Sequence, residues 1–148
     1  MSEHPTTLKF VSSNRRVRED RRFVVGGGHY VADIVLDEML HVAIVPSQYP
    51  AARIVSIDTT EALKMPGVVY ALTGEELVKA VDPLMNGLDT PKVRRYPLAV
   101  GQVRYAGEWV VAVVAETRAQ AEDAIEKVRV EYEPLPYVIG AEDAITDA

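Results

Sequence analysis

Three histidines, His4, His29 and His41, are the side chains of this 148-residue chain best suited to chemistry near neutral pH. They are scattered. None lies at metal-ligand spacing from another histidine or a carboxylate on one predicted element, so we expect no zinc or iron site. The chain also has no cysteine, which excludes thiolate zinc sites, cysteine nucleophiles and an iron–sulfur cluster held by this chain alone.

Two further patterns match parts of known sites but lack the residues that would complete them. Gly26-Gly27-Gly28 is followed by no Lys-Ser/Thr pair, and Val31 stands where a dinucleotide fingerprint needs its third glycine, so we interpret the run as a turn. The acidic pairs Glu75-Glu76 and Glu122-Asp123 lie on predicted helices, where adjacent side chains point apart. We interpret them as solvated. The sequence therefore predicts no catalytic, cofactor-binding or metal-binding residue.

Arginines are concentrated near the N-terminus, where residues 15–22 include five of them. The guanidinium fork suits carboxylates and phosphates, and arginine is enriched at protein interfaces. Two interpretations are open: a solvated or partly self-paired arm, or a segment that docks on another subunit. On the second interpretation, Arg15, Arg16 and Arg18 are candidate subunit-interface residues.

A second candidate interface is the turn Gly107-Glu108-Trp109, which leads into the strongest predicted strand. Trp109 and the nearby Tyr105 combine an apolar ring with a polar atom, as interface anchors do. The alternative is that Trp109 packs in the protein's own core. We name Gly107, Glu108 and Trp109 as candidate subunit-interface residues.

The acidic side chains in excess are all in the C-terminal part of the chain. The formal net charge is −6; residues 1–115 carry 13 acidic and 13 basic side chains, and residues 116–148 carry 9 acidic and 3 basic ones. A nucleic-acid partner is not expected, because phosphate contacts need clustered lysine and arginine. No window has the length of a membrane span and the N-terminus has no signal-peptide core, so we expect a soluble, cytoplasmic chain.

Hydrophobic periodicity and turn residues divide the chain into strands and short helices. Phe23–Val25 and His29–Ile34 are predicted to be extended pieces around the glycine turn. The predicted strands are residues 39–45, expected to be largely buried, 53–58, 68–72, 109–115, expected to be central, and 128–132. Helices are predicted after Asp58, after Thr73, where Glu76 completes a capping box, and over 117–128.

This order predicts an α+β (mixed α/β) domain built around one sheet with short helices. The predicted organisation is an Arg-rich N-terminal arm over residues 1–22, the domain over 23–140 and a C-terminal tail over 141–148. Residues 81–97, which contain three prolines, form the longest irregular stretch and a further candidate for a partner contact.

Short motifs in a fixed order, each weak alone, cover about residues 14–145. They include GGGHYVADI at 26–34, MLHVA at 39–43, ARIVSIDT at 52–59, MPGVV at 65–69, LTGEEL at 72–77, VRYAGE at 103–108 and VEYEPLP at 130–136. Together they resemble the N-terminal domain of the large, molybdenum-binding subunit of the xanthine dehydrogenase, aldehyde oxidase and carbon monoxide dehydrogenase family. One departure is Trp109, which stands where that family usually carries proline.

The resemblance implies the α/β hammerhead fold and a structural role within an enzyme. The family's molybdopterin-binding and catalytic residues lie in later domains, beyond Ala148, and none is carried over to this chain. We therefore expect a separately encoded hammerhead subunit, or a fragment, that is not catalytic by itself and packs against a molybdenum-cofactor-binding large subunit.

The same resemblance implies the cofactors and reaction of the complex. Partner subunits would carry molybdopterin-bound molybdenum, iron–sulfur clusters and often FAD. The complex would hydroxylate an aldehyde or an N-heterocycle with oxygen from water, or carry out a related hydratase or dehydrogenase reaction. The alternative is a free-standing hammerhead module that binds a protein or a small ligand and has no enzyme partner.

Overall fold

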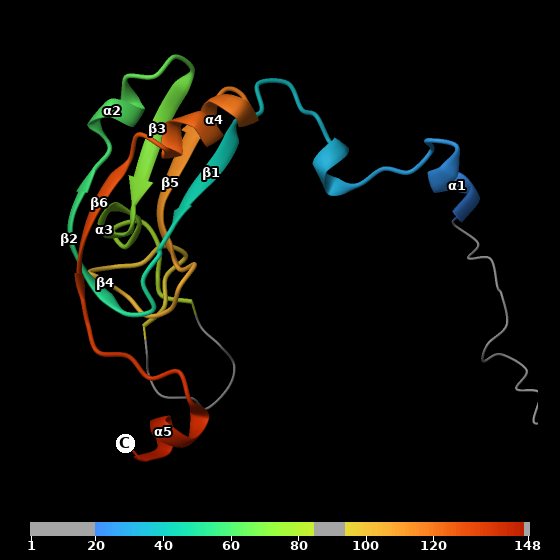
Figure 1. Ribbon diagram of the computed structural model, residues 1–148. Coiled ribbons are helices and arrows are strands. Elements are labelled where there is room, and N and C mark those ends of the chain that lie inside the picture. Colours follow the sequence, from blue (N-terminus) through green and yellow to red (C-terminus); the bar gives the residue numbers. More distant parts are fainter. Residues whose placement is uncertain (1–19, 85–93, 147–148) are drawn as a thin grey trace, which may run out of the picture. The chain divides into compact units, whose positions relative to one another are not determined.

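The computed structural model describes residues 20–84 and 94–146 (Figure 1). Contacts divide the chain into two compact units, Met1–Asp37 and Glu38–Ala148, which are described separately here. In the described ranges, no helix is both long enough and apolar enough to cross a membrane.

The first unit contains two short helical elements, α1 (Asp20–Val24) and the 3-10 turn η1 (Val31–Asp33). The prediction of extended pieces here is wrong. An extended segment needs a ladder partner for its backbone groups, and the described part of the chain pairs none with these residues. Local bonds form instead, because the Asp33 carboxylate accepts the Tyr30 N–H at 2.8 Å.

The second unit contains two three-stranded antiparallel sheets, so the prediction of a single sheet is wrong. Sheet A has the order β1 (His41–Pro46), β5 (Trp109–Ala115), β3 (Val68–Thr73). Sheet B has the order β4 (Gln102–Val103), β2 (Ala52–Asp58), β6 (Arg129–Pro134). Period and propensity identify strands without identifying their partners, and residues from both sheets share one hydrophobic core.

The centre of that core is β5, as the sequence predicts. Val110, Val111 and Val113 are fully buried, and β5 pairs with β1 on one side and β3 on the other. Ala52 on β2 and Val103 on β4 bring sheet B into the same cluster. A strand flanked on both sides and packed against another layer is the most apolar segment of a fold, which explains its strong sequence signal.

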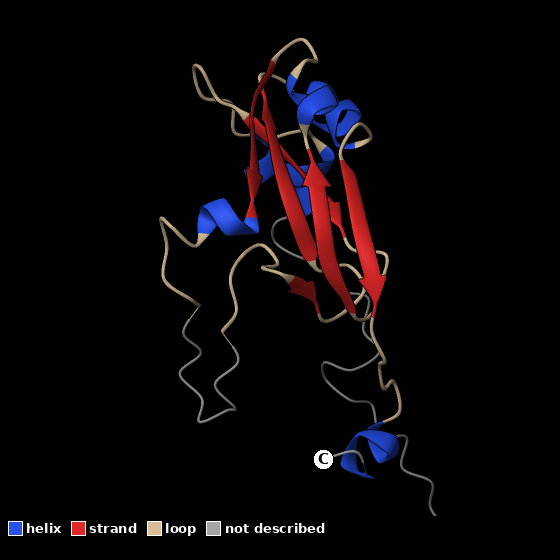
Figure 2. Ribbon diagram, turned by 90° about the vertical axis from the view of Figure 1, so that its left-hand side faces the viewer, coloured by secondary structure: helices blue, strands red, loops and turns tan. Residues whose placement is uncertain are grey.

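Helix α4 (Arg118–Ile125) packs on sheet A through small side chains. The Thr117 side chain caps it by accepting the Gln120 N–H, and the buried Ala121 and Ala124 face the core, as predicted. The predicted helix runs to 128, but α4 ends at Ile125. It lies beside α2 (Thr60–Leu63) at one end of the strands (Figures 1 and 2).

The described residues form two further short helices, one beside β3 and one near the C-terminus. The predicted capping box of Thr73 and Glu76 begins α3 (Gly74–Leu77). Gly74 is buried, and a Cβ there would lie 1.9 Å from the Ala99 carbonyl oxygen, so α3 and the chain at Ala99 are held in close contact. The last helix, α5 (Ala141–Thr146), buries none of its residues.

The Asp58 carboxylate makes the free energy of unfolding of the second unit depend on pH in the acid range. It accepts the Thr60 N–H at 2.9 Å, and the hydrogen bonds from Thr60 lower its pKa below the ordinary 3.8. Because the folded-state pKa is the lower one, its stabilising contribution is complete above pH 3.8 and is lost as pH falls through the folded-state pKa. We expect Asp58→Ala to lower the free energy of unfolding at neutral pH, and this difference to shrink in acid.

Urea unfolding of both proteins between pH 2.5 and 7 measures this difference. Glu116→Ala is a suitable control, because Glu116 is an exposed acidic residue just before α4. A difference between wild type and Asp58→Ala that stays constant across the pH range would contradict the assignment.

Candidate functional site

The structure describes half of the residues predicted to form an interface. Arg15, Arg16 and Arg18 lie outside the described residues. Gly107, Glu108 and Trp109 lie together in the tight turn that leads into β5. The candidate site is therefore centred on that turn.

The turn is held against the end of β1 by a pair of backbone hydrogen bonds to one residue. The Gly107 N–H donates to the Ser47 carbonyl, and the Ser47 N–H donates to the Glu108 carbonyl, each at 2.8 Å. Ser47 is buried, and its hydroxyl also accepts the Tyr49 N–H at 3.0 Å. These bonds join segments sixty residues apart in sequence and fix the position of the turn.

Gly107 is required by the backbone of this turn. Its φ is +90°, a conformation that side chains disfavour, and the Glu108 N–H closes the turn on the Tyr105 carbonyl at 3.2 Å. A Cβ at Gly107 would meet no atom within 4 Å. Its requirement is therefore conformational and does not depend on close packing.

Glu108 is anchored within its own turn. Its side chain is only 14% exposed, its carboxylate accepts the Arg104 backbone N–H, and the Arg104 Nη1 lies 4.0 Å away. A half-buried residue bound in this way orders the turn, since a carboxylate hydrogen-bonded to backbone N–H is a strong local restraint.

Trp109 points its ring largely into solvent. The residue is 52% exposed, so the alternative that it packs in the core is wrong. Its backbone carbonyl accepts the Ala99 N–H at 2.6 Å, which connects the turn to the chain before β4. Contact between Trp109 and a partner subunit stays a prediction.

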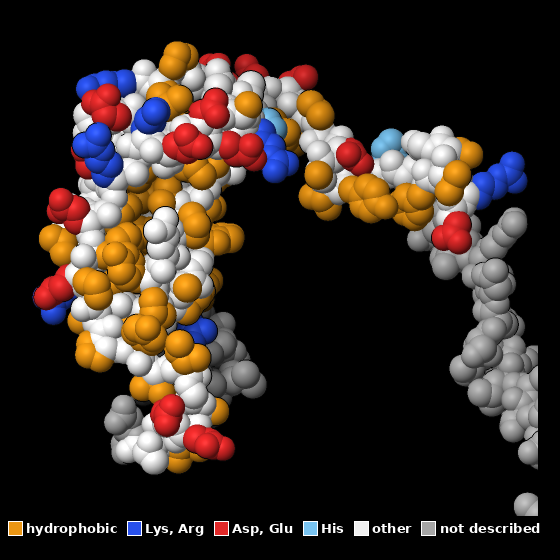
Figure 3. Space-filling model, in the orientation of Figure 1, with side chains coloured by type: hydrophobic (Ala, Val, Ile, Leu, Met, Phe, Trp, Pro, Cys, Tyr) orange, Lys and Arg blue, Asp and Glu red, His pale blue; other side chains and the backbone are white. Residues whose placement is uncertain are grey.

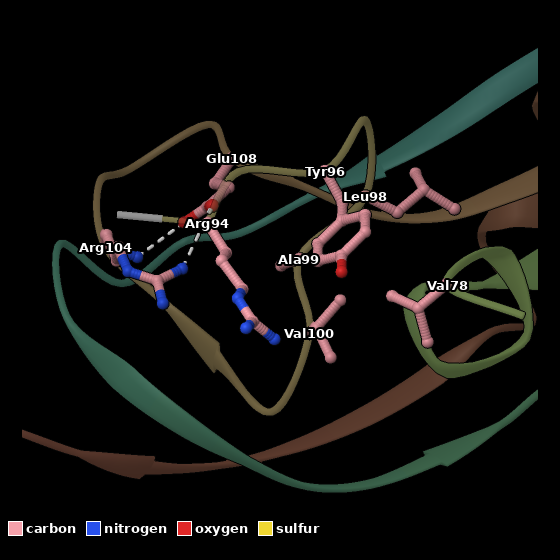
Figure 4. Close-up of a pocket in the computed structure, with 8 residues that line it drawn as sticks. All are labelled: Val78, Arg94, Tyr96, Leu98, Ala99, Val100, Arg104 and Glu108. Carbon is pink, nitrogen blue, oxygen red and sulfur yellow. Dashed lines mark hydrogen bonds and ion pairs between the residues drawn. The ribbon is translucent and has the colours of Figure 1, made fainter. Parts of the chain in front are cut away.

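A pocket of about 300 Å³ adjoins this turn (Figure 4). Sequence reasoning missed it, because its walls come from three separate stretches of the chain. The residues that line it are Val78, Arg94, Tyr96, Leu98, Ala99, Val100, Arg104 and Glu108. The clustering of arginine with a tyrosine just before Leu98 is visible in the sequence, but the approach of Val78 and Arg104 depends on the fold.

One face of sheet A is an exposed apolar surface. The register places Val42 opposite Val114 and Val114 opposite Tyr70, so the three share one face of the sheet. Val42 is 59% and Tyr70 is 47% exposed. Val69, at the register shift of β3, is 53% exposed. We call Val42, Val69, Tyr70 and Val114 the outer face of sheet A.

The prediction that residues 39–45 are largely buried is therefore wrong. In β1 only Ala43 is buried, and the other residues are half-buried or exposed. The reason is geometric, because side chains of a strand alternate between faces and only one face of sheet A packs on α4 and the shared core. An apolar run carries no signal that one of its faces is uncovered.

A second apolar surface lies between the edge strands of the two sheets. A groove of about 310 Å³ between β1 and β6 is lined by Val45, Pro46, Gln48, Tyr49, Val128, Val130 and Tyr132. Figure 3 shows hydrophobic side chains gathered there, below the acidic surface of α4. Burial raises the pKa of the Tyr132 phenol above its ordinary value of 10.0.

Lys64 and Arg118 each form an ion pair with a carboxylate three or four residues away. The hydrogen bond to Glu61 raises the pKa of Lys64, and the hydrogen bond to Glu122 raises the pKa of Arg118. No group of three or more His, Cys, Asp or Glu side chains in residues 20–84 and 94–146 is arranged to hold a metal ion.

Comparison with known proteins identifies the fold and its family. The sequence model of the aldehyde oxidase and xanthine dehydrogenase a/b hammerhead domain matches residues 25–136. The chain belongs to this family. The predicted resemblance and the mixed α/β hammerhead fold are thus confirmed, and the two sheets described above are the sheets of a hammerhead domain.

Relatives of this hammerhead domain are parts of larger oxidoreductase chains. The gamma subunit of the 6-hydroxypseudooxynicotine dehydrogenase complex of Paenarthrobacter nicotinovorans is 42% identical over 136 residues, which are 87% of this chain and 17% of the relative. The crystal structure of quinoline 2-oxidoreductase from Pseudomonas putida 86 matches with a TM-score of 0.80 and 42% identity, covering 86% of this chain and 17% of that one.

A third match is the Cu,Mo-CO dehydrogenase, with a TM-score of 0.73, 37% identity and coverage of 90% of this chain and 16% of that one. The hammerhead chain thus spans about one sixth of the length of each of these three proteins. The match over most of this chain establishes its family, and one of the matched proteins is a molybdenum enzyme by name.

The conformation of Gly107 predicts how the hammerhead domain responds to substitution at this turn. We expect Gly107→Ala to lower the free energy of unfolding by about 1–2 kcal/mol, because an L-residue is disfavoured at this positive φ. Gly107→Asn should cost less, since asparagine adopts positive φ more readily. Chemical denaturation of the full chain measures both values. Equal stability of wild type and Gly107→Ala would contradict the role of Gly107.

Proposed function

We propose that this chain is the non-catalytic hammerhead subunit of a molybdenum hydroxylase-type oxidoreductase. In this role it docks on a molybdenum-cofactor-binding large subunit and helps to shape the complex. The observation that carries the proposal is the family match over residues 25–136 combined with an outer face of sheet A that is apolar and exposed.

The exposed apolar residues support a docking role. Large contiguous apolar patches are uncommon on monomeric proteins and mark interaction surfaces. Val42, Val69 and Tyr70 lie on one sheet face, and Trp109 begins the central strand of the same sheet. A stable complex buries more than about 1,000 Å² in total. An interface of that size needs several exposed residues and cannot be made by one side chain.

The first unit supports the same role. Neither α1 nor η1 contains a buried residue, and Val24, Val31 and Val35 are each more than 80% exposed. Apolar residues in such a segment gain stability when a partner covers them. The proposal includes docking by the N-terminal arm with Arg15, Arg16 and Arg18, whose guanidinium groups suit acidic groups on a partner.

The proposal assigns the cofactors and the reaction to partner subunits. Bound there, a molybdopterin-held molybdenum centre would supply hydroxylation of an aldehyde or N-heterocycle, or a related hydratase or dehydrogenase reaction, with iron–sulfur clusters and often FAD carrying electrons. The residues described in this chain offer no metal-ligand cluster, so its contribution is binding, positioning and exclusion of water at the contact surface.

Gentle purification of the tagged chain from its native host tests this role. We expect a larger subunit to co-purify in fixed ratio, with stoichiometric molybdenum and with iron. A chain that is recovered alone and free of metal would overturn the proposal and favour the free-standing binding module.

A matched pair of variants tests the surface. Val42 on sheet A and Val55 on sheet B are both strand valines and both 59% exposed. We expect Val42→Glu to weaken capture of the large subunit at least about tenfold, because a carboxylate would be buried without a partner. Val55→Glu should leave capture unchanged. Equal capture by both variants, each with wild-type circular dichroism, would exclude the outer face of sheet A.

A further inference from the structure

Two arginines from different parts of the chain line the pocket beside the Gly107 turn. Arg94 and Arg104 place their guanidinium groups at one end of it, and Tyr96, Leu98 and Val78 lie at the other end (Figure 4). We propose that this pocket binds a carboxylate group carried on an apolar body, such as an aromatic or aliphatic monocarboxylic acid.

The charges of the lining favour a ligand with one negative charge. The lining contains two guanidinium groups, those of Arg94 and Arg104, and a single carboxylate, that of Glu108, so it carries a net charge of +1. Glu108 is already engaged by the backbone N–H and guanidinium group of Arg104. Arg94 makes no ion pair with any described residue and stays available to an incoming carboxylate.

The geometry of the guanidinium group favours a carboxylate. Its planar fork of N–H donors matches the two oxygens of a carboxylate, and such charge-assisted bonds are about twice as strong as neutral ones. A second guanidinium group nearby strengthens the attraction for the same anion. The site thus offers positive charge at one end only, and the Tyr96 hydroxyl lies at the other end among apolar side chains.

The remaining lining explains why the carboxylate should carry an apolar body. Leu98 and Ala99 are buried, and Val78 and Val100 are half-buried beside them. This wall is held in place, because the Ala99 N–H donates to the Trp109 carbonyl at 2.6 Å and Gly74 packs against the Ala99 carbonyl. A volume of about 300 Å³ is at the lower end of the range for small-molecule pockets.

The carboxylate can come from two sources, a free small acid or an Asp or Glu side chain of the large subunit. The second source rests on the function proposed above, and the first does not. A protein carboxylate at this position would link the turn of Gly107 and Trp109 directly to the partner.

Titration of the full chain with benzoate tests the pocket independently of any partner. We expect benzoate, and not the neutral benzamide, to shift the amide resonances of Tyr96, Leu98, Ala99 and Val100 in a saturable way. Arg94→Gln should weaken binding about tenfold or more, because a charged hydrogen bond is lost. The control is Arg95→Gln, since Arg95 is a neighbouring exposed arginine that does not line the pocket; it should bind as wild type does.

Capture of the large subunit by the same variants separates the two sources. Benzoate binding that depends on Arg94 supports the proposal with a free acid as ligand, even if no partner co-purifies. Absence of benzoate binding, together with capture weakened by Arg94→Gln and not by Arg95→Gln, supports it with a protein carboxylate as ligand. Absence of benzoate binding with equal capture, or with no partner to capture, overturns it.

Discussion

The central position of β5 is the constraint on which the second unit depends. Its valines fill the core, its two backbone edges pair with β1 and β3, and its first residue ends the turn that holds Glu108. A strand that pairs along both edges and is buried over residues 110–113 has little freedom to shift its register, because a slip of one residue would exchange its faces. The positions of Trp109 and of the neighbouring pocket wall follow from that fixed register.

The elements of this fold were largely predictable because each carries a local signal. Residues close together in the sequence determine three of these features, and each is present in the structure. They are the apolar run of β5, the Thr117 cap of α4 and the Thr73–Glu76 capping box. The division into two sheets was not predictable, since β2 pairs with β6 across more than seventy residues. Around Phe23 and Tyr30, local side-chain bonds replaced the extended structure that composition favoured.

The candidate site divides in the same way. The turn at Gly107 and Glu108 was predictable because neighbouring residues determine it, whereas the role of Ser47 depends on the fold and carried no signal. Contact of this turn with a partner stays a prediction. The exposure of Val42 and Tyr70 could not be predicted for a related reason. The sequence of an apolar strand is similar whether one of its faces or both are covered. Uncovered faces and shared pockets are tertiary properties, which the sequence of one strand or one turn does not determine.

One edge strand of each sheet ends in a proline. β1 and β6 are both edge strands, and each has a proline, Pro46 or Pro134, as its last residue. Proline has no N–H to offer, so each ladder stops being extendable at that point, and proline at strand edges discourages pairing between molecules. A chain with exposed apolar faces is at risk of adding strands from its own copies while it is synthesised. The two prolines shorten the template for such growth.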